Sequence, residues 1–219
     1  MELKTMEIIT GRYGKGTPEE NKIIDSIFGN VNAEEKFRIY FFWYNVIHEL
    51  GHAIMMVYND VRPHPVKEEQ LVNDFAVAFW LHYGEDKMIN NLKDIVQCSL
   101  LNFMCPANIG VTHIDWAIEK WGTDELFNFN NYGWFQFNCV NNSLNGKKPL
   151  SSVLKQMNIN DINKQSKISF AFPVLTEETV PDILSRAVDA LKSWGVALPK
   201  IQHSFDNDPN KHMVIIVNE

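Results

Sequence analysis

The chain has 219 residues, of which 45% are hydrophobic and 21% are charged, which is enough for one sizeable core or for a core with an appended lobe. Its formal net charge is −7 and it contains no run of Lys and Arg, which argues against a nucleic-acid-binding protein. Cys98, Cys105 and Cys139 form no C-x-x-C pair, and the first residues contain no apolar signal core. We therefore expect a cytoplasmic protein without a disulfide framework.

The first predicted elements are a strand and a helix. Residues Glu7–Thr10 favour a short strand. The string that begins at Thr17 is typical of a helix start, because Thr is a good N-cap, Pro18 suits the first helical position and Glu20 can complete a capping box. Gly29 is expected to end this helix.

A long apolar helix is predicted next, over Ala33–Tyr58. This range contains no Pro, and Asn32 with Glu35 is predicted to form a second capping box. Its one glycine, Gly51, costs the helix about 1 kcal/mol relative to Ala. Because Gly51 has no side chain, we expect another element to approach the helix closely at this point.

This helix contains the most informative motif of the chain, because His48, Glu49 and His52 spell H-E-x-x-H. Residues four apart share one face of a helix, so both imidazoles can bind one metal ion. Zn²⁺ prefers such nitrogen ligands and lowers the pKa of a bound water to ~7, and Glu49 can then accept the proton of that water as a general base. The alternative interpretation is a pair of core histidines that are satisfied by hydrogen bonds, which carries a desolvation cost.

The stretch around the motif must also be considered as a membrane span. Ile39–Val57 is mostly apolar over 19 residues, which is close to the length that crosses a bilayer. It contains two His and one Glu, which are costly inside a bilayer, and the mean hydropathy of the chain is −0.21. We therefore predict a buried helix of a globular protein and no membrane partner.

A turn at Pro63–Pro65 is predicted to lead into a second helix. This helix is strongly indicated over Lys67–Trp80 and is expected to end at Gly84. Glu69 lies 21 positions after His48, and the string from Glu69 is E-x-x-V-N-x-F-A. The helix therefore carries a carboxylate and an amide one turn apart, on one face.

With these two motifs the chain resembles the gluzincin metallopeptidases, and among them most closely the ImmA/IrrE-like family. The resemblance covers about residues 33–82, and Val72 stands where the family's E-x-x-A-N-x-F-A string has Ala. It implies that Glu69 is the third zinc ligand and that Asn73 orients a ligating His. It also implies that the substrate is a cytoplasmic regulatory protein, which is an inference by analogy.

The residues alone leave other third ligands open. Glu68 is turned about 100° from Glu69 around the helix, and its own face continues through apolar residues, so it can also point inward. Asp74 and His64 are further candidates by ligand chemistry. Carboxylates in a first helical turn are otherwise expected to be solvated and favoured by the helix dipole.

Two further helices are predicted over Glu85–Met104 and over His113–Trp121, and an aromatic-rich stretch with many Asn and Gln follows at 127–137. The functional interpretation of this stretch is a wall of a substrate cleft, in which Tyr132 or His113 donates a hydrogen bond to the oxyanion of a tetrahedral intermediate, although packing is favoured for any single residue. The alternative interpretation is a helix or loop whose aromatic residues pack over the core.

The character of the chain changes near residues 145–149. We therefore predict a zincin-like catalytic domain over 1–148 and a C-terminal α/β subdomain over 149–219, unless the two form one compact domain. The C-terminal part is β-α-β-like, and its connection at 195–211 has room for another strand. Its predicted elements are a strand at 167–172, a helix at 176–194 and a strand at 212–217.

Together these patterns predict an α+β fold that is mainly helical, with a zincin-like core, a second ligand-bearing helix and a small sheet. The expected function is a peptidase in which His48, His52 and Glu69 hold Zn²⁺, Glu49 is the general base, and the partner is a peptide or protein substrate. Three alternatives stay open: a zinc-binding sensor or interaction module without peptidase activity, a partner-binding domain in which H-E-x-x-H is incidental, and hydrolysis of a non-peptide amide.

Overall fold

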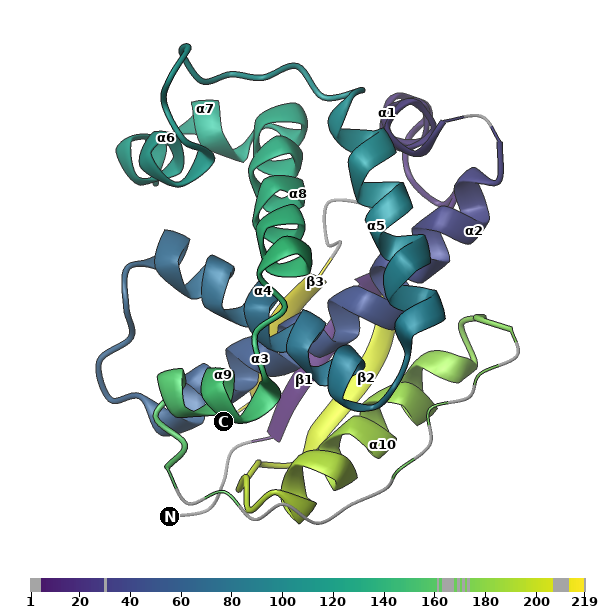
Figure 1. Cartoon of the computed structure of the whole chain (residues 1–219). Helices are drawn as coiled ribbons and strands as arrows, with labels where there is room; N and C mark the ends of the chain where they lie inside the picture. The colour runs from purple at the N-terminus through teal and green to yellow at the C-terminus, as the bar shows by residue number, and fades with distance from the viewer. Residues whose placement is uncertain are drawn as a thin grey trace.

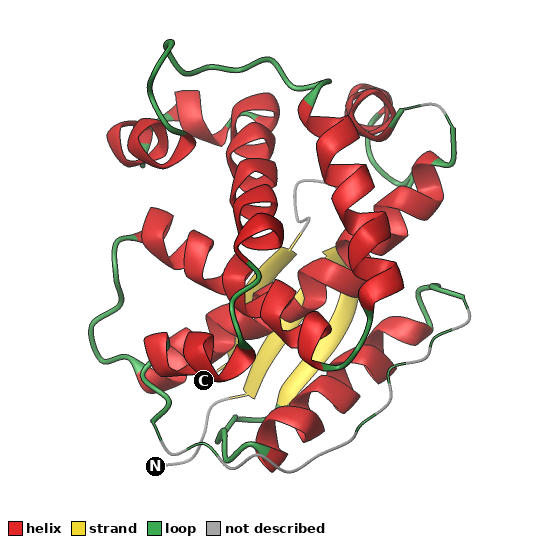
Figure 2. Ribbon diagram, in the orientation of Figure 1, coloured by secondary structure: helices red, strands yellow, loops and turns green. Residues whose placement is uncertain are grey.

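The structure is a computed structural model, and it describes residues 5–29, 31–160, 162, 168, 170, 172, 174–206 and 213–218. These residues form a mainly helical α+β fold with one small sheet, as predicted (Figure 2). The strands and helices are β1 (Thr5–Gly11), α1 (Pro18–Phe28), α2 (Ala33–Phe37), the π-helix η1 (Arg38–Tyr44), α3 (Asn45–Tyr58), α4 (Pro65–His82), α5 (Asp86–Leu100), α6 (His113–Lys120), α7 (Asp124–Phe127), α8 (Phe129–Gly146), α9 (Leu150–Gln156), α10 (Thr179–Ser193), β2 (Ile201–Asp206) and β3 (Met213–Asn218).

The sheet joins the two ends of the described chain. β1 is its central strand, and it runs parallel to β2 and antiparallel to β3. In register, Met6 faces Ile201, and Thr5 faces Asn218. α3 packs against β1 and β3, whereas α10 packs against β2 and α3 (Figure 1). The C-terminal strands therefore complete a sheet that the N-terminal strand begins, while the domain boundary at residue 148 stays a prediction.

The two predicted capping boxes have different outcomes. At α1 the box is confirmed, because the Thr17 side chain accepts a hydrogen bond from the Glu20 amide and the Glu20 carboxylate accepts one from the Thr17 amide. The box at Asn32 is wrong. Asn32 has a φ of 56° and its side chain makes no capping hydrogen bond, because a left-handed residue directs its side chain away from the first helical turn.

The predicted helix over residues 33–58 is helical throughout, but its middle is not an α-helix. α2 continues into η1, where the hydrogen bonds skip one residue further, and the amide of Asn45 donates to the carbonyl of Tyr40. Such a wider turn changes which side chains share a face with the residues that follow. It therefore sets how the residues before His48 are placed relative to the H-E-x-x-H face.

α3 and α4 pack closely, and Gly51 allows this approach. A Cβ atom at Gly51 would lie 3.0 Å from both Cδ1 of Phe75 and Cβ of Val72. Trp43 of η1, just before α3, also packs on α4, where its ring stacks on that of Trp80 with centroids 4.4 Å apart. The expected close approach is confirmed, and the approaching element is the helix that carries Glu69.

The remaining predicted helices are present, with changed ends. α5 ends at Leu100 rather than near Met104, whereas α6 begins after Thr112 as expected, since the Thr112 hydroxyl accepts a hydrogen bond from the Asp115 amide. The aromatic-rich stretch covers the last residue of α7, Phe127, and the first half of α8. Among the described residues, no helix combines the length and the apolar character needed to cross a membrane.

The C-terminal part differs from the predicted β-α-β order. The strand expected at 167–172 lies partly outside the described residues, and the described members of that range, Ile168, Phe170 and Phe172, are not in a strand. The helix is present as α10 and the last strand as β3. The additional strand for which the 195–211 connection has room is present as β2.

Candidate metal centre

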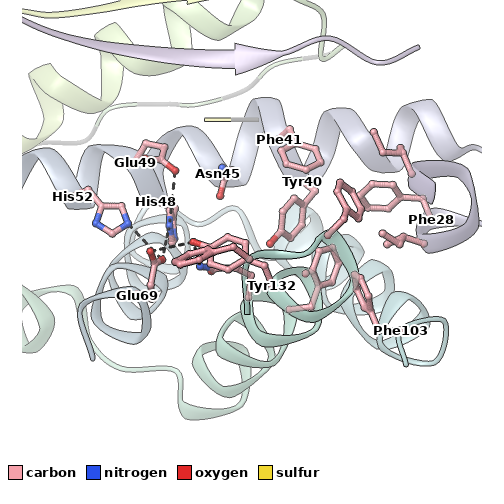
Figure 3. A pocket seen from close by; sticks show the side chains of 17 residues that line it. Phe28, Tyr40, Phe41, Asn45, His48, Glu49, His52, Glu69, Phe103 and Tyr132 are labelled. Carbon is pink, nitrogen blue, oxygen red and sulfur yellow. Dashed lines mark hydrogen bonds and ion pairs between the residues drawn. The ribbon is translucent and has the colours of Figure 1, made fainter. Parts of the chain in front are cut away.

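The H-E-x-x-H motif and Glu69 come together between α3 and α4. Nε2 of His48 lies 3.3 Å from Oε2 of Glu69, and Nε2 of His52 lies 3.5 Å from the same oxygen (Figure 3). One ligand atom from each residue lies within 4.8 Å of the other two. This group of two imidazoles and one carboxylate could hold a metal ion.

The carboxylate of Glu69 has an unusual environment for a buried anion. Glu69 is 9% exposed, and no residue of the described chain donates a hydrogen bond to its Oε2. Leaving a buried carboxylate oxygen without a hydrogen bond is costly. A cation between this oxygen and the two imidazoles would remove that cost, so the residues fit a metal ion.

The ring of His48 is oriented by Asn73. Nδ1 of His48 lies 3.1 Å from Oδ1 of Asn73, which also accepts a hydrogen bond of 2.7 Å from the Tyr44 hydroxyl. The Asn73 amide nitrogen donates to the backbone carbonyl of Glu69 at 2.8 Å, which fixes the direction of the amide. Because Oδ1 only accepts, the proton of His48 belongs on Nδ1, and Nε2 is left to face Glu69.

The ring of His52 is oriented by Glu68, which the sequence presented only as an alternative ligand. Nδ1 of His52 lies 2.7 Å from Oε1 of Glu68. Arg62 holds this carboxylate through both of its oxygens, with its Nε 2.8 Å from Oε2. Glu68 therefore binds the far side of the imidazole and is not in the group of three, and no pattern in the sequence marked Arg62 as its partner.

The other two alternative ligands lie elsewhere on α4. His64 is the N-cap of this helix, where its side chain accepts a hydrogen bond from the Val66 amide. Asp74 pairs with Lys148 at 2.6 Å. Neither residue belongs to the group that could hold an ion.

Glu69 and His52 shift one another's pKa values. Burial alone would raise the pKa of Glu69, but the charge of His52 and the contacts of both imidazoles hold that pKa well below its ordinary value. Burial would likewise lower the pKa of His52, but the charge of Glu69 and the hydrogen bond that His52 donates to Glu68 hold that pKa well above its ordinary value. A metal ion would replace the proton of His52, because only the neutral imidazole is a ligand.

Glu49 lies next to this group and outside it. Its Oε1 is 3.9 Å from Nε2 of His48, and its side chain lines the cavity beside the centre (Figure 3). Burial raises the pKa of Glu49, although the two histidines act against that shift. The position is that of a carboxylate that can reach a group on the ion without binding the ion itself.

The two predicted oxyanion donors are placed differently. Tyr132 lines the cavity, and its hydroxyl lies 3.4 Å from Oε1 of Glu69 and accepts a hydrogen bond from Gln136. His113 is not among the described residues that line this cavity. It begins α6 and lies near the ring of Trp134 and the side chain of Asn142, and burial lowers its pKa. The structure therefore brings Tyr132 to the centre and leaves His113 outside it.

No protein-family model matches the chain, and no curated protein or solved structure shows significant similarity to it. The likeness to the ImmA/IrrE-like metallopeptidases therefore depends on the two motifs alone.

Proposed function

We propose that this protein is a zinc-dependent peptidase whose ion is held by His48, His52 and Glu69. The observation that carries the proposal is the buried Oε2 of Glu69, which accepts no hydrogen bond from the described chain and lies 3.3 and 3.5 Å from two imidazole nitrogens. Two ligands of a tetrahedral ion with bonds of about 2.1 Å lie about 3.4 Å apart. A tetrahedral site with two nitrogens and one carboxylate oxygen is typical of catalytic zinc, which keeps a fourth position open.

The chemistry is divided between the ion and the side chains around it. Zinc supplies an activated water and polarises a carbonyl oxygen when it is bound. Glu49 is placed beside Nε2 of His48, so its carboxylate can accept a proton from the attacking nucleophile and deliver it to the leaving amine. The Tyr132 hydroxyl lines the same cavity and donates to Oε1 of Glu69 at 3.4 Å, and it can turn this hydrogen bond to the developing oxyanion.

Asn73 and Glu68 complete the proposed machinery without touching the ion. Each accepts a hydrogen bond from Nδ1 of one histidine, so that both Nε2 atoms are directed at Glu69. Loss of such a partner lowers metal affinity about 10- to 100-fold in known sites, which is less than the loss expected for a ligand. Glu68 and Glu69 are adjacent on one helix, so the size of the loss in zinc affinity distinguishes the ligand from the residue that orients a histidine.

The first experiment measures zinc per chain and zinc affinity for the wild type, Glu69→Ala and Glu68→Ala, all purified without added metal. We expect about one zinc per wild-type chain, a loss beyond 100-fold for Glu69→Ala and a loss of 10- to 100-fold for Glu68→Ala. A wild type that takes up no zinc at micromolar concentration would refute the site.

The second experiment asks for hydrolysis with a peptide library and compares the wild type with Glu49→Gln, which keeps the size of the side chain. The variant should bind zinc as the wild type does and lose about 1,000-fold or more of its hydrolysis, since it cannot accept a proton. A zinc-loaded wild type that cleaves no peptide would favour an interaction module instead.

A further inference from the structure

The cavity at the metal centre has two chemically different ends. It has a volume of about 400 Å³ and reaches from the two histidines, Glu49 and Glu69 to a wall of apolar side chains (Figure 3). The far end is formed by residues of α1, η1, α8 and the segment after α5, namely Ile24, Ile27, Phe28, Phe41, Phe103 and Phe137. Of the described residues that line the cavity, those that can carry a charge at neutral pH are all at the metal end.

Aromatic rings pack against one another at the apolar end. Phe137 stacks on Tyr40 with ring centroids 4.4 Å apart, and it also packs against Phe28 at 6.2 Å and Phe103 at 5.2 Å. Phe28, Phe103 and Phe137 are buried, so these rings already pack against one another in this structure. The pocket therefore needs little rearrangement to accept a ligand.

We propose that this end is a specificity pocket that accepts one large apolar or aromatic side chain next to the scissile bond of the substrate, an inference that rests on the proposed peptidase function. A cavity of about 150 Å³ is enough to bind benzene in a protein core. The volume found here holds such a ring together with part of a peptide backbone. A Lys or Asp side chain would find no counter-ion among the residues of the apolar end and would be excluded by its desolvation cost.

Gly133 of α8 contacts the wall of this pocket at Phe103. A Cβ atom at Gly133 would lie 2.6 Å from Cε1 of Phe103, so the ring of Phe103 must move in Gly133→Ala. Gly146 lies on the same helix, and a Cβ atom there meets nothing within 4 Å. Gly146→Ala is therefore the matched control for the substitution itself.

The test measures kcat/KM for a peptide series that varies at each position beside the bond cleaved in the library. At one position we expect Phe or Leu to exceed Ala by about 100-fold or more, because a single methylene in an apolar pocket is worth about 10- to 200-fold. Lys and Asp should be cleaved more slowly than Ala. Gly133→Ala should reduce the ratio for Phe over Ala at least 10-fold, whereas Gly146→Ala should leave it unchanged. Cleavage without any apolar preference would overturn the pocket and leave the peptidase proposal intact.

A second measurement separates the pocket from the reaction. A peptide with 4-fluorophenylalanine is titrated with Glu49→Gln, and its fluorine resonance is followed by NMR, with the same peptide carrying Ala as a competitor. We expect the fluorine resonance to broaden and shift on binding to Glu49→Gln. Adding Gly133→Ala to this variant should weaken the change, whereas adding Gly146→Ala should leave it unaltered. If no peptide is cleaved but this binding is seen, the peptidase proposal fails and the pocket stands. If the fluorinated ring does not bind, the pocket is refuted.

Discussion

Two buried acidic side chains on α4 have opposite environments. Asp74 is 5% exposed, and its carboxylate accepts hydrogen bonds from Lys148 at 2.6 Å, Ser143 at 2.8 Å and Gln70 at 3.3 Å. Glu69 is 9% exposed, and its Oε2 accepts none from the described chain. Burial is nearly equal, so it does not distinguish a structural carboxylate from a candidate ligand, whereas the presence of hydrogen-bond donors does.

The two environments also differ in what they connect. Asp74 links α4 to α8 and, through Lys148, to the connection before α9, so its contacts contribute to folding without any ligand. In the part of the chain that the structure describes, the Glu69 carboxylate has polar contacts with the two imidazoles and the Tyr132 hydroxyl. We therefore expect substitution of Asp74 to change stability and substitution of Glu69 to change metal binding.

The largest expected effect is the response of stability to zinc. With free zinc at 1,000 times its dissociation constant, the free energy of unfolding of the wild type should rise by about 4 kcal/mol, and a chelator should reverse the rise. Glu69→Gln should show almost no rise, because an amide is a poor zinc ligand. The measurement is urea unfolding with and without zinc, followed by circular dichroism.

Asp74→Asn is the control for this experiment. It removes the charge that pairs with Lys148, which is partly exposed and can be solvated, so the zinc-free protein should lose about 2 kcal/mol, below the usual loss for a fully buried pair. The rise with zinc should stay near that of the wild type. Equal zinc responses in Asp74→Asn and Glu69→Gln would show that the hydrogen-bond difference between the two carboxylates has no functional meaning.

The next effect tests whether the distance between α3 and α4 sets the metal site. Gly51→Ala gains about 1 kcal/mol in helix propensity but must push against Val72 and Phe75, and such overpacking costs about 1–3 kcal/mol. Because Glu69 lies on the helix that is pushed, zinc affinity should fall about 10-fold. Competition with a chelating dye measures it, and Gly146→Ala, with an open environment, should match the wild type. Unchanged affinity in Gly51→Ala would mean that the site tolerates a change in helix spacing.

The close approach at Gly51 is one of the features that could be predicted from the sequence. A glycine within an apolar helix predicts close approach, and H-E-x-x-H predicts two imidazoles on one face, because both follow from helical geometry. The choice of Glu69 as the third member of the group came from the resemblance to the gluzincins, since the residues alone left other ligands open. The left-handed backbone of Asn32 and the π-helix of η1 depend on how neighbouring elements pack, so the local pattern did not predict them.

Contacts between residues far apart in the sequence could not be predicted either. β1 pairs with strands about 200 residues later, and no local pattern specifies which strands meet. The sequence does not show whether Glu68 binds a metal ion or an imidazole, because that depends on a residue outside its helix. In the structure Arg62 binds the Glu68 carboxylate and His52 contacts its Oε1. The carboxylate–imidazole contact therefore required the tertiary structure.

The smallest expected effect concerns a third ionisable group, the half-buried His203, which is hydrogen-bonded in its neutral form. Nε2 of His203 on β2 lies 2.8 Å from the hydroxyl of the buried Thr10. Burial lowers the pKa of His203 to about 4 from 6.5, and the charge of Glu7 acts against the shift. Between these two values the unfolded chain binds more protons than the folded one, so stability is complete above pH 6.5 and is lost as the pH falls towards 4.

Because His203 is partly exposed, the loss from this group should be about 1 kcal/mol, well below the value for a fully buried shift. Urea unfolding in zinc-free buffer from pH 7 to pH 4, in the Glu69→Gln background, should show a smaller decrease for His203→Gln than for its parent. Above pH 6.5 the difference between the two proteins should not depend on pH, since the imidazole is neutral in both states. If the stability of His203→Gln and of its parent fell equally over the whole pH range, the acid sensitivity would belong to other groups. The comparison of satisfied and unsatisfied buried groups would then apply to the two carboxylates and not to this histidine.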